Sequence, residues 1–208
     1  ALLETDYNTR FAADTPPLLR FTLVKCSPTQ HKLIFTNHHL LLDGWSIPVL
    51  LDELFRLYLA EPLPPAVSYR DYLYWLAERD TEKMREAWRE ALRGLQGPTH
   101  LAKGRTTDNL QPHLLHRTVD ADRTRQLNRC ARELGVTVNT LLQCAWGMLL
   151  GALTGRCDVV FGITVSGRPA ELSGIERMVG LLINTLPLRL SWRMEESFAT
   201  LLQRLQAE

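Results

Sequence analysis

The sequence contains few cysteines, and they form no pattern that would mark a disulfide framework or a metal site. Its 208 residues include four of them, Cys26, Cys130, Cys144 and Cys157, without a C-x-x-C pair, so we expect reduced thiols in a cytoplasmic protein. An excess of one charge is also missing, because 24 lysines and arginines face 23 aspartates and glutamates, and no net field attracts nucleic acid. Long apolar runs are absent too, since the longest, residues 141–153, is interrupted by Gln143 and two glycines. These absences predict a soluble protein that binds neither nucleic acid nor a membrane.

The two ends of the sequence lack the features of a complete chain. Ala1 is not a methionine, and the first ten residues have neither the charged nor the apolar part of a signal peptide. At the other end, the amphipathic helix that we expect over residues 196–208 reaches the last residue without a cap or a turn. We therefore expect a segment of a longer protein.

The hydrophobic pattern predicts strands that alternate with helices. Strands are expected over residues 18–24, 32–37, 115–119, 159–165 and 179–190. Helices are expected over residues 47–59, 68–78, 81–92 and 121–134, and from Thr137 or Asn139 to Gly155, with Ser46 as the N-cap of the first. The last of these helices is apolar all round, which predicts burial on several faces. Glycine and polar residues without periodicity predict a linker over residues 96–113, so the pattern indicates an α/β architecture in two lobes.

The stretch from His38 to Ser46 holds the residues best suited to chemistry. His38 and His39 follow a predicted strand and precede Asp43 and Gly44, so imidazole, carboxylate and an exposed backbone amide fall within one short loop. Imidazole transfers protons near neutral pH, and glycine lets a substrate approach the main chain closely. These are the parts of an acyl-transfer site.

The same residues allow two other interpretations. His38 and His39, as neighbours on a strand, would point to opposite faces and could not bind one ion together, so we expect no metal. Alternatively, the histidines are core side chains that form hydrogen bonds at the end of a strand, and Asp43 only caps a turn. The residues alone leave this structural interpretation open.

Three sequence elements in register carry a family resemblance. The first resembles the H-H-x-x-x-D-G signature of the chloramphenicol acetyltransferase-like superfamily, followed by Trp45 and Ser46 as is typical of condensation domains of nonribosomal peptide synthetases. Residues 69–75 resemble the Y-x-D-Y-x-x-W element of those domains. Residues 179–189 are similar to their V-G-x-F-x-N-T-x-P-x-R element, with Leu182 in place of the phenylalanine. Together these elements identify the sequence as a suspected condensation domain.

The resemblance implies a fold and a reaction. It implies the two-lobed chloramphenicol acetyltransferase-like fold, of class α/β, as an incomplete central fragment. Residues 1–95 would belong to the N-terminal lobe, residues 96–113 to the linker and residues 114–208 to the first part of the C-terminal lobe. The implied reaction is formation of a peptide bond between a carrier-bound acyl or peptidyl thioester and a carrier-bound aminoacyl acceptor.

The resemblance also implies partners and leaves two alternatives. Both substrates would arrive on the phosphopantetheine arms of upstream and downstream peptidyl carrier proteins, among other modules of a synthetase, and no cofactor would be bound. One alternative is another H-H-x-x-x-D-G acyltransferase that uses a freely diffusing acceptor. The other is a noncatalytic domain of the same fold that recruits a partner. The sequence does not specify the donor, the acceptor or the oligomeric state. It also does not say whether this segment is active alone.

The resemblance assigns roles to the residues of the first element. His39 would be the catalytic residue, which deprotonates or orients the acceptor amine. His38 would be a buried packing or hydrogen-bonding residue on the other face of the strand. Asp43 would hold the loop through a salt bridge to an arginine that the sequence does not identify. If that arginine belongs to a part of the protein outside this segment, Asp43 is left as an uncompensated buried charge. The amide of Gly44 would stabilise an oxyanion, or else Gly44 would serve a turn that needs positive φ.

Three further residues are candidates for the site. Asn184 would line the cleft, and the alternative is that its side chain pairs with a backbone group at a strand edge. Trp45 and Ser46 are candidates for lining the substrate channel.

Overall fold

The computed structural model describes residues 2–101 and 114–207, and the predicted linker therefore lies outside the described residues over positions 102–113. The described chain forms two compact units. The first consists of Ala1–Asp80 and Thr164–Thr185, and the second of Thr81–Ile163 and Leu186–Glu208. The predicted lobes are continuous in sequence, whereas these units are not, because residues 164–185 pack with the first eighty residues. The assignment of sequence ranges to lobes of a complete enzyme stays a prediction.

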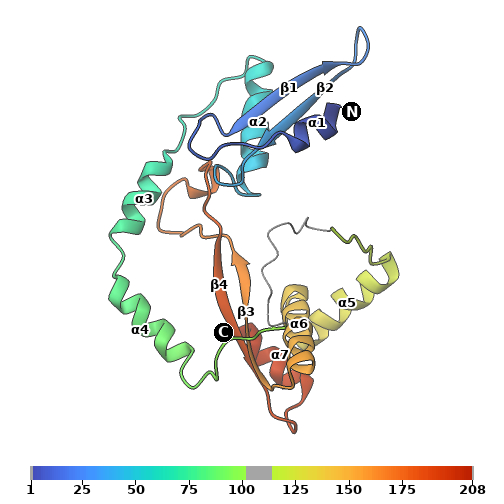
Figure 1. Cartoon of the computed structure of the whole chain (residues 1–208), viewed down its shortest axis with the longest axis vertical. Coiled ribbons are helices and arrows are strands. Elements are labelled where there is room, and N and C mark those ends of the chain that lie inside the picture. The colour runs from blue at the N-terminus through green and yellow to red at the C-terminus, as the bar shows by residue number, and fades with distance from the viewer. Residues whose placement is uncertain (1, 102–113, 208) are drawn as a thin grey trace. The chain divides into compact units, whose positions relative to one another are not determined.

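The first unit begins with a short helix and a β-hairpin (Figure 1). Helix α1 (Leu2–Asn8) contacts β2 (His31–Asn37), which pairs antiparallel with β1 (Leu19–Lys25) in the register Leu19 to Asn37. Both predicted strands are confirmed. Asp6 attaches the helix to the hairpin, because its carboxylate accepts hydrogen bonds from the Thr36 hydroxyl and from Nε of Arg20, the latter at 3.1 Å.

Two helices follow the hairpin. Helix α2 (Ser46–Tyr58) confirms a predicted helix, but Ser46 is its first residue and not its N-cap. Trp45 occupies the cap position in a helical conformation, and the Asp43 carboxylate accepts the hydrogen bond of the Ser46 N–H. Helix α3 (Tyr69–Ala77) begins after Ser68, whose hydroxyl accepts a hydrogen bond from the N–H of Arg70.

Residues 164–185 complete the first unit with a small core. Ile175, Met178 and Leu182 are buried in it, and the partly buried side chains around them are Val67, Tyr69, Tyr72 and Leu172. A 3₁₀ helix, η1 (Ile175–Arg177), forms part of this segment. The strand predicted over residues 179–190 begins only at Asn184, because the Leu181 carbonyl accepts from the Tyr69 hydroxyl and the Leu182 N–H donates to Asp43. Side chains thus occupy backbone groups that a strand ladder would use.

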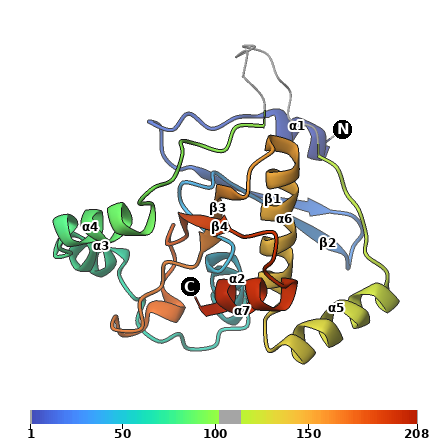
Figure 2. The same ribbon diagram turned by 90° about the horizontal axis from the view of Figure 1, so that it is seen from below.

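The described residues of the second unit form four helices and most of a two-stranded sheet. The helices are α4 (Thr81–Ala91), α5 (Ala121–Leu134), α6 (Val138–Thr154) and α7 (Phe198–Ala207), and β3 (Asp158–Val165) pairs with β4 (Asn184–Ser191). Helix α7 packs against α5 and α6 (Figure 2). The core includes Cys144, Val159, Leu190 and Leu202. Gly135 in the left-handed conformation ends α5 and Thr137 caps α6, as predicted, whereas residues 115–119 are exposed and form no strand in the described structure.

Helix α6 is buried on one face only, contrary to the prediction. Its buried stripe includes Leu141, Cys144 and Leu150, while Leu142, Trp146, Leu149 and Leu153 are exposed in the described part of the chain. No single described helix is long and apolar enough to cross a bilayer, and α5 with α6 meet that length and composition only as a pair bent by 96°.

Candidate functional site

The two histidines lie in a turn beyond the end of β2. The turn is closed by a hydrogen bond of 3.1 Å from the Leu41 N–H to the His38 carbonyl. Nδ1 of His38 accepts a hydrogen bond from the Leu40 N–H at 3.0 Å, which places a proton of the neutral ring on Nε2. Both His38 and His39 are exposed, so the expected burial of His38 is wrong. Neither residue is part of the strand, so the expected placement of the two rings on opposite strand faces is wrong as well.

A metal site is not formed by these groups in the described part of the chain. Among residues 2–101 and 114–207, no three His, Cys, Asp or Glu side chains gather closely enough to hold an ion. The turn offers His39 as an exposed imidazole, four positions before the buried carboxylate of Asp43.

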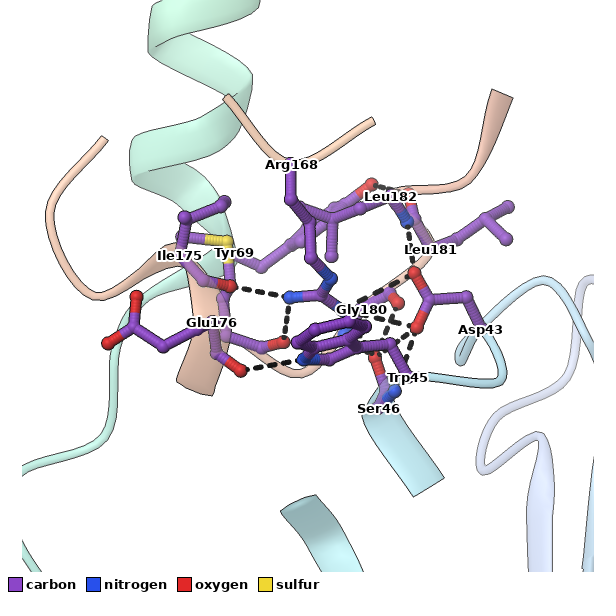
Figure 3. Close-up of polar contacts among 11 residues, drawn as sticks. Asp43, Trp45, Ser46, Tyr69, Arg168, Ile175, Glu176, Gly180, Leu181 and Leu182 are labelled. Carbon is purple, nitrogen blue, oxygen red and sulfur yellow. Dashed lines mark hydrogen bonds and ion pairs between the residues drawn. The ribbon is translucent and has the colours of Figure 1, made fainter. Parts of the chain in front are cut away.

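Asp43 pairs with an arginine that belongs to this chain (Figure 3). Nη2 of Arg168 lies 3.2 Å from Oδ1 and 3.3 Å from Oδ2 of Asp43, and the two side chains are 5% and 0% exposed. The other terminal nitrogen, Nη1, donates to the carbonyls of Ile175 at 2.5 Å and Met178 at 2.9 Å. Asp43 is therefore not left as an uncompensated buried charge, and the salt bridge that the resemblance implied has its partner in Arg168.

The carboxylate of Asp43 is also surrounded by hydrogen-bond donors. Oδ1 accepts from the backbone N–H of Ser46 at 2.8 Å and from its hydroxyl at 2.7 Å, and Oδ2 accepts from the Leu182 N–H at 3.1 Å. Burial by itself raises the pKa of Asp43. The hydrogen bonds from Ser46 and Leu182 and the charge of Arg168 outweigh that effect and hold the pKa below its ordinary value. The folded protein thus stabilises the ionised carboxylate.

The two residues after Gly44 lie in different surroundings. Ser46 is 0% exposed, and its hydroxyl bonds to both backbone groups of Gly180, so its burial does not favour the predicted place in a channel. Trp45 is 53% exposed, its indole N–H donates to the Glu176 carbonyl at 2.9 Å, and its ring lies 5.5 Å from the Arg168 guanidinium carbon. Of the two channel candidates, only Trp45 is exposed, and its place in a channel stays a prediction.

Gly44 and Asn184 each have two interpretations. Gly44 is not among the glycines with positive φ, and a Cβ there would meet no atom within 4 Å, so the turn does not require glycine. Its role at an oxyanion stays a prediction. Asn184 is exposed at the start of β4, and its Oδ1 accepts from the Thr185 N–H at 2.8 Å, which is the strand-edge alternative. Its cleft-lining role also stays a prediction.

Three residues of this network are not predicted as site residues from the sequence. Tyr69 and Gly180 fall within sequence elements that carry the resemblance and Arg168 lies outside them, but no local signal connects any of the three to Asp43. The Tyr69 hydroxyl donates to the Leu181 carbonyl at 2.8 Å, and a Cβ on Gly180 would collide with the Tyr69 ring. Burial raises the pKa of Tyr69. Helix α3 therefore supports the segment that contacts Asp43.

Comparisons with known proteins agree over the whole chain. The family model described as Condensation domain matches residues 1–208. Chondramide synthase cmdD of Chondromyces crocatus is 41% identical over 208 residues, which are 93% of this chain and 5% of that protein. A linear gramicidin synthase protein of Brevibacillus parabrevis is 41% identical over 204 residues, 92% of this chain and 3% of that protein.

Solved structures share the fold. The SgcC5 protein from Streptomyces globisporus is similar with a TM-score of 0.77 and 25% identity, over 99% of this chain and 49% of that one. The first condensation domain of the CDA synthetase has a TM-score of 0.76 and 24% identity, over 99% and 48%. The predicted α/β fold of the chloramphenicol acetyltransferase type is thus confirmed. The chain spans about half the length of these solved structures and a small part of the curated relatives.

Proposed function

Because the chain belongs to the condensation-domain family, we propose that it is part of an acyltransferase that forms peptide bonds in nonribosomal peptide synthesis. The observation that carries the proposal is the exposed turn that contains His39. The buried ion pair of Asp43 and Arg168 holds the end of this turn in place. An exposed imidazole can meet a substrate, and a buried, fully paired carboxylate holds the loop that carries it.

The proposed reaction joins two tethered substrates. The amine nitrogen of the acceptor attacks the carbonyl carbon of the donor thioester, a C–N bond forms, the C–S bond breaks, and the proton lost by the amine passes to the departing thiolate. His39 either takes this proton or orients the amine for attack. The backbone amide of Gly44 would donate to the oxyanion of the tetrahedral intermediate. No atom lies within 4 Å of a Cβ placed on Gly44, so the main chain is open on that side.

Asp43 supports the reaction without contact with the substrate. Its carboxylate is buried under the turn and occupied by Arg168, Ser46 and Leu182, so it has no free position for a reacting group. It therefore fixes the loop in place. Trp45, exposed beside this network, is the remaining candidate for a surface along which a substrate passes.

The substrates are proposed to arrive on phosphopantetheine arms of peptidyl carrier proteins. The support is the family itself and the similarity to peptide synthases such as bacitracin synthase 1 of Bacillus licheniformis, which is 36% identical over 99% of this chain. The single family model accounts for residues 1–208 in full, so the carriers would be supplied by other parts of a synthetase.

The decisive experiment is a single-turnover assay in the intact synthetase, with donor and acceptor loaded on their carriers. We expect His39→Ala to lower the rate of amide formation by about 100-fold or more, as loss of a proton-transfer group does. His31→Ala, which removes an exposed imidazole from β2 in the same unit, is the matched control and should not change the rate. His39→Gln keeps a hydrogen-bonding side chain but cannot take the proton, so it separates orientation from base catalysis.

Three outcomes would count against the proposal. Undiminished product from His39→Ala would exclude His39 from the reaction. No product from the wild-type protein with any loaded pair would favour the noncatalytic recruitment domain. Equal rates with a free amine and with a carrier-bound acceptor would favour an acyltransferase for diffusing substrates.

A further inference from the structure

The hydroxyl of Ser46 is enclosed by polar atoms from three segments of the first unit. Oγ lies 2.7 Å from Oδ1 of Asp43, 2.8 Å from the carbonyl and 3.0 Å from the N–H of Gly180, and 3.3 Å from Nη2 of Arg168. A hydroxyl has one hydrogen and two lone pairs. The Gly180 N–H and Arg168 can fill both lone pairs, and the single hydrogen has two acceptors within reach. The hydrogen-bonding capacity of Ser46 is therefore used completely, in a place with 0% exposure.

This hydroxyl joins two segments that are 134 positions apart in the sequence. The contact is extended on either side, because the Asp43 N–H donates to the Gly180 carbonyl at 3.2 Å and the Leu182 N–H donates to Asp43 at 3.1 Å. Figure 3 shows these groups converging between the turn before α2 and the segment before β4. His39 precedes Asp43 by four positions, and Asn184 follows Leu182 by two. The network therefore joins two segments that hold, within a few positions, His39 and the predicted cleft residue Asn184.

We infer that Ser46 is a positioning residue of the proposed reaction, whose hydroxyl locks the His39 turn to the segment that leads to Asn184. The inference rests on the proposed function. Ser46 is not a catalytic residue, because its burial and its filled hydrogen bonds keep it from any substrate. Its effect on the rate passes through the placement of the turn, where a shift of the order of 1 Å is enough to slow a reaction between aligned groups.

The fold can survive loss of this hydroxyl. In Ser46→Ala, Asp43 keeps Arg168 and the N–H groups of Ser46 and Leu182, so the ion pair remains. The Gly180 N–H loses its partner, and one acceptor position of the carboxylate is left open. The structure therefore predicts a loosened connection between the two segments without global unfolding.

The test compares Ser46→Ala and Ser46→Thr with Ser27→Ala in the intact synthetase. Ser27 is a suitable control because its hydroxyl accepts a hydrogen bond from the Thr29 N–H in the hairpin turn of the same unit. Single-turnover rates are measured against the concentration of loaded acceptor carrier. We expect Ser46→Ala to lower the maximal rate by about tenfold or more, with half-saturation changed by less than about twofold. Ser46→Thr retains the hydroxyl and should recover most of the rate, while Ser27→Ala should match the wild type.

Hydrogen exchange followed by mass spectrometry supplies the structural readout. In Ser46→Ala, peptides that cover residues 179–183 should exchange faster, because the Gly180 N–H has lost its acceptor, whereas the β1–β2 hairpin should be unchanged. If the added methyl group of Ser46→Thr unfolds the whole unit, Ser46→Cys is used in its place. Cysteine is closer to serine in volume, and its thiol is a weaker donor than the hydroxyl, so this variant should give an intermediate rate.

The outcomes separate the inference from the proposed function. A maximal rate of Ser46→Ala within about twofold of the wild type overturns the positioning role, provided that His39→Ala is inactive. Faster exchange across the entire first unit, with the rate lowered in proportion to the folded fraction, also overturns it, since a purely structural role would give that result. Full activity of His39→Ala overturns the proposed function itself.

Discussion

Replacing Arg168 by methionine would test the buried ion pair most directly. The methionine fills much of the space of the arginine stem but brings no charge and no donor. The Asp43 carboxylate, 0% exposed, would lose its counter-charge. The carbonyls of Ile175 and Met178 would lose the hydrogen bonds that the guanidinium group donates to them. The substitution therefore leaves one buried charge without its counter-charge and the Met178 carbonyl without the donor from Arg168, while the Ile175 carbonyl still accepts from the Met178 N–H at 3.3 Å.

The expected cost follows from the burial and from the donors that remain. Removing one member of a buried pair typically destabilises a protein by about 3–5 kcal/mol. Ser46 and Leu182 still donate to the carboxylate, which places the effect near the lower end, at about 3 kcal/mol. The pair of Arg56 and Glu61 in the same unit is the control, since it is 36% and 52% exposed and Arg56→Met should cost no more than about 1 kcal/mol.

Urea denaturation combined with hydrogen exchange would measure this effect. Exchange assigns the loss of stability to the first unit, and a cycle with Asp43→Asn and the double variant tests the coupling. Because Asp43→Asn removes the charge that Arg168→Met leaves unpaired, the double variant should be less destabilised than the sum of the single variants, by about 1–3 kcal/mol. Additive effects, or a cost for Arg168→Met no greater than that for Arg56→Met, would refute the claim that the pair holds the turn.

The part of the site that sequence could predict depends on local chemistry. The turn with His39, Asp43 and Gly44 follows from residues close together in the chain, as do the left-handed Gly135 and the Thr137 cap. Caps and tight turns are decided by a few neighbouring residues, so their signals are present in any short window. For the same reason the predicted bounds of the hairpin and of most helices agree with the structure within a few residues.

The rest depends on contacts between distant residues. Arg168 is 125 positions from Asp43, and a single sequence contains nothing that pairs them. Ser46 has the side chain of an N-cap residue, but the Asp43 carboxylate accepts the hydrogen bond of the Ser46 backbone N–H. The Ser46 hydroxyl bonds to the carbonyl of Gly180, 134 positions away in the sequence. Residues 179–183 have the apolar character of a strand, yet their backbone groups bond to side chains of Asp43 and Tyr69. Tertiary contacts override local propensity in these cases.

Two remaining predictions concern protonation and glycine. The pKa of Asp43 in the folded protein lies below the ordinary aspartate value of 3.8, so its stabilising contribution is complete above that value and is lost as the pH falls through the folded pKa. Urea denaturation between about pH 6 and about pH 2 should show this loss of unfolding free energy in the wild type and in Asp52→Asn, which replaces an exposed residue as a control. Asp43→Asn should lose less. An equal dependence of the unfolding free energy on pH in all three proteins would contradict this prediction. Gly44→Ala should change the unfolding free energy by less than about 0.5 kcal/mol, because no atom lies within 4 Å of the added Cβ. Gly167→Ala should cost at least about 1–3 kcal/mol, because Gly167 has a φ of +59° and its Cβ would collide with the Leu182 carbonyl. If Gly44→Ala keeps this stability and yet forms amide more slowly than the wild type, the close approach of a substrate to the main chain, and not the turn, is what requires glycine there. A normal rate would contradict such a close approach.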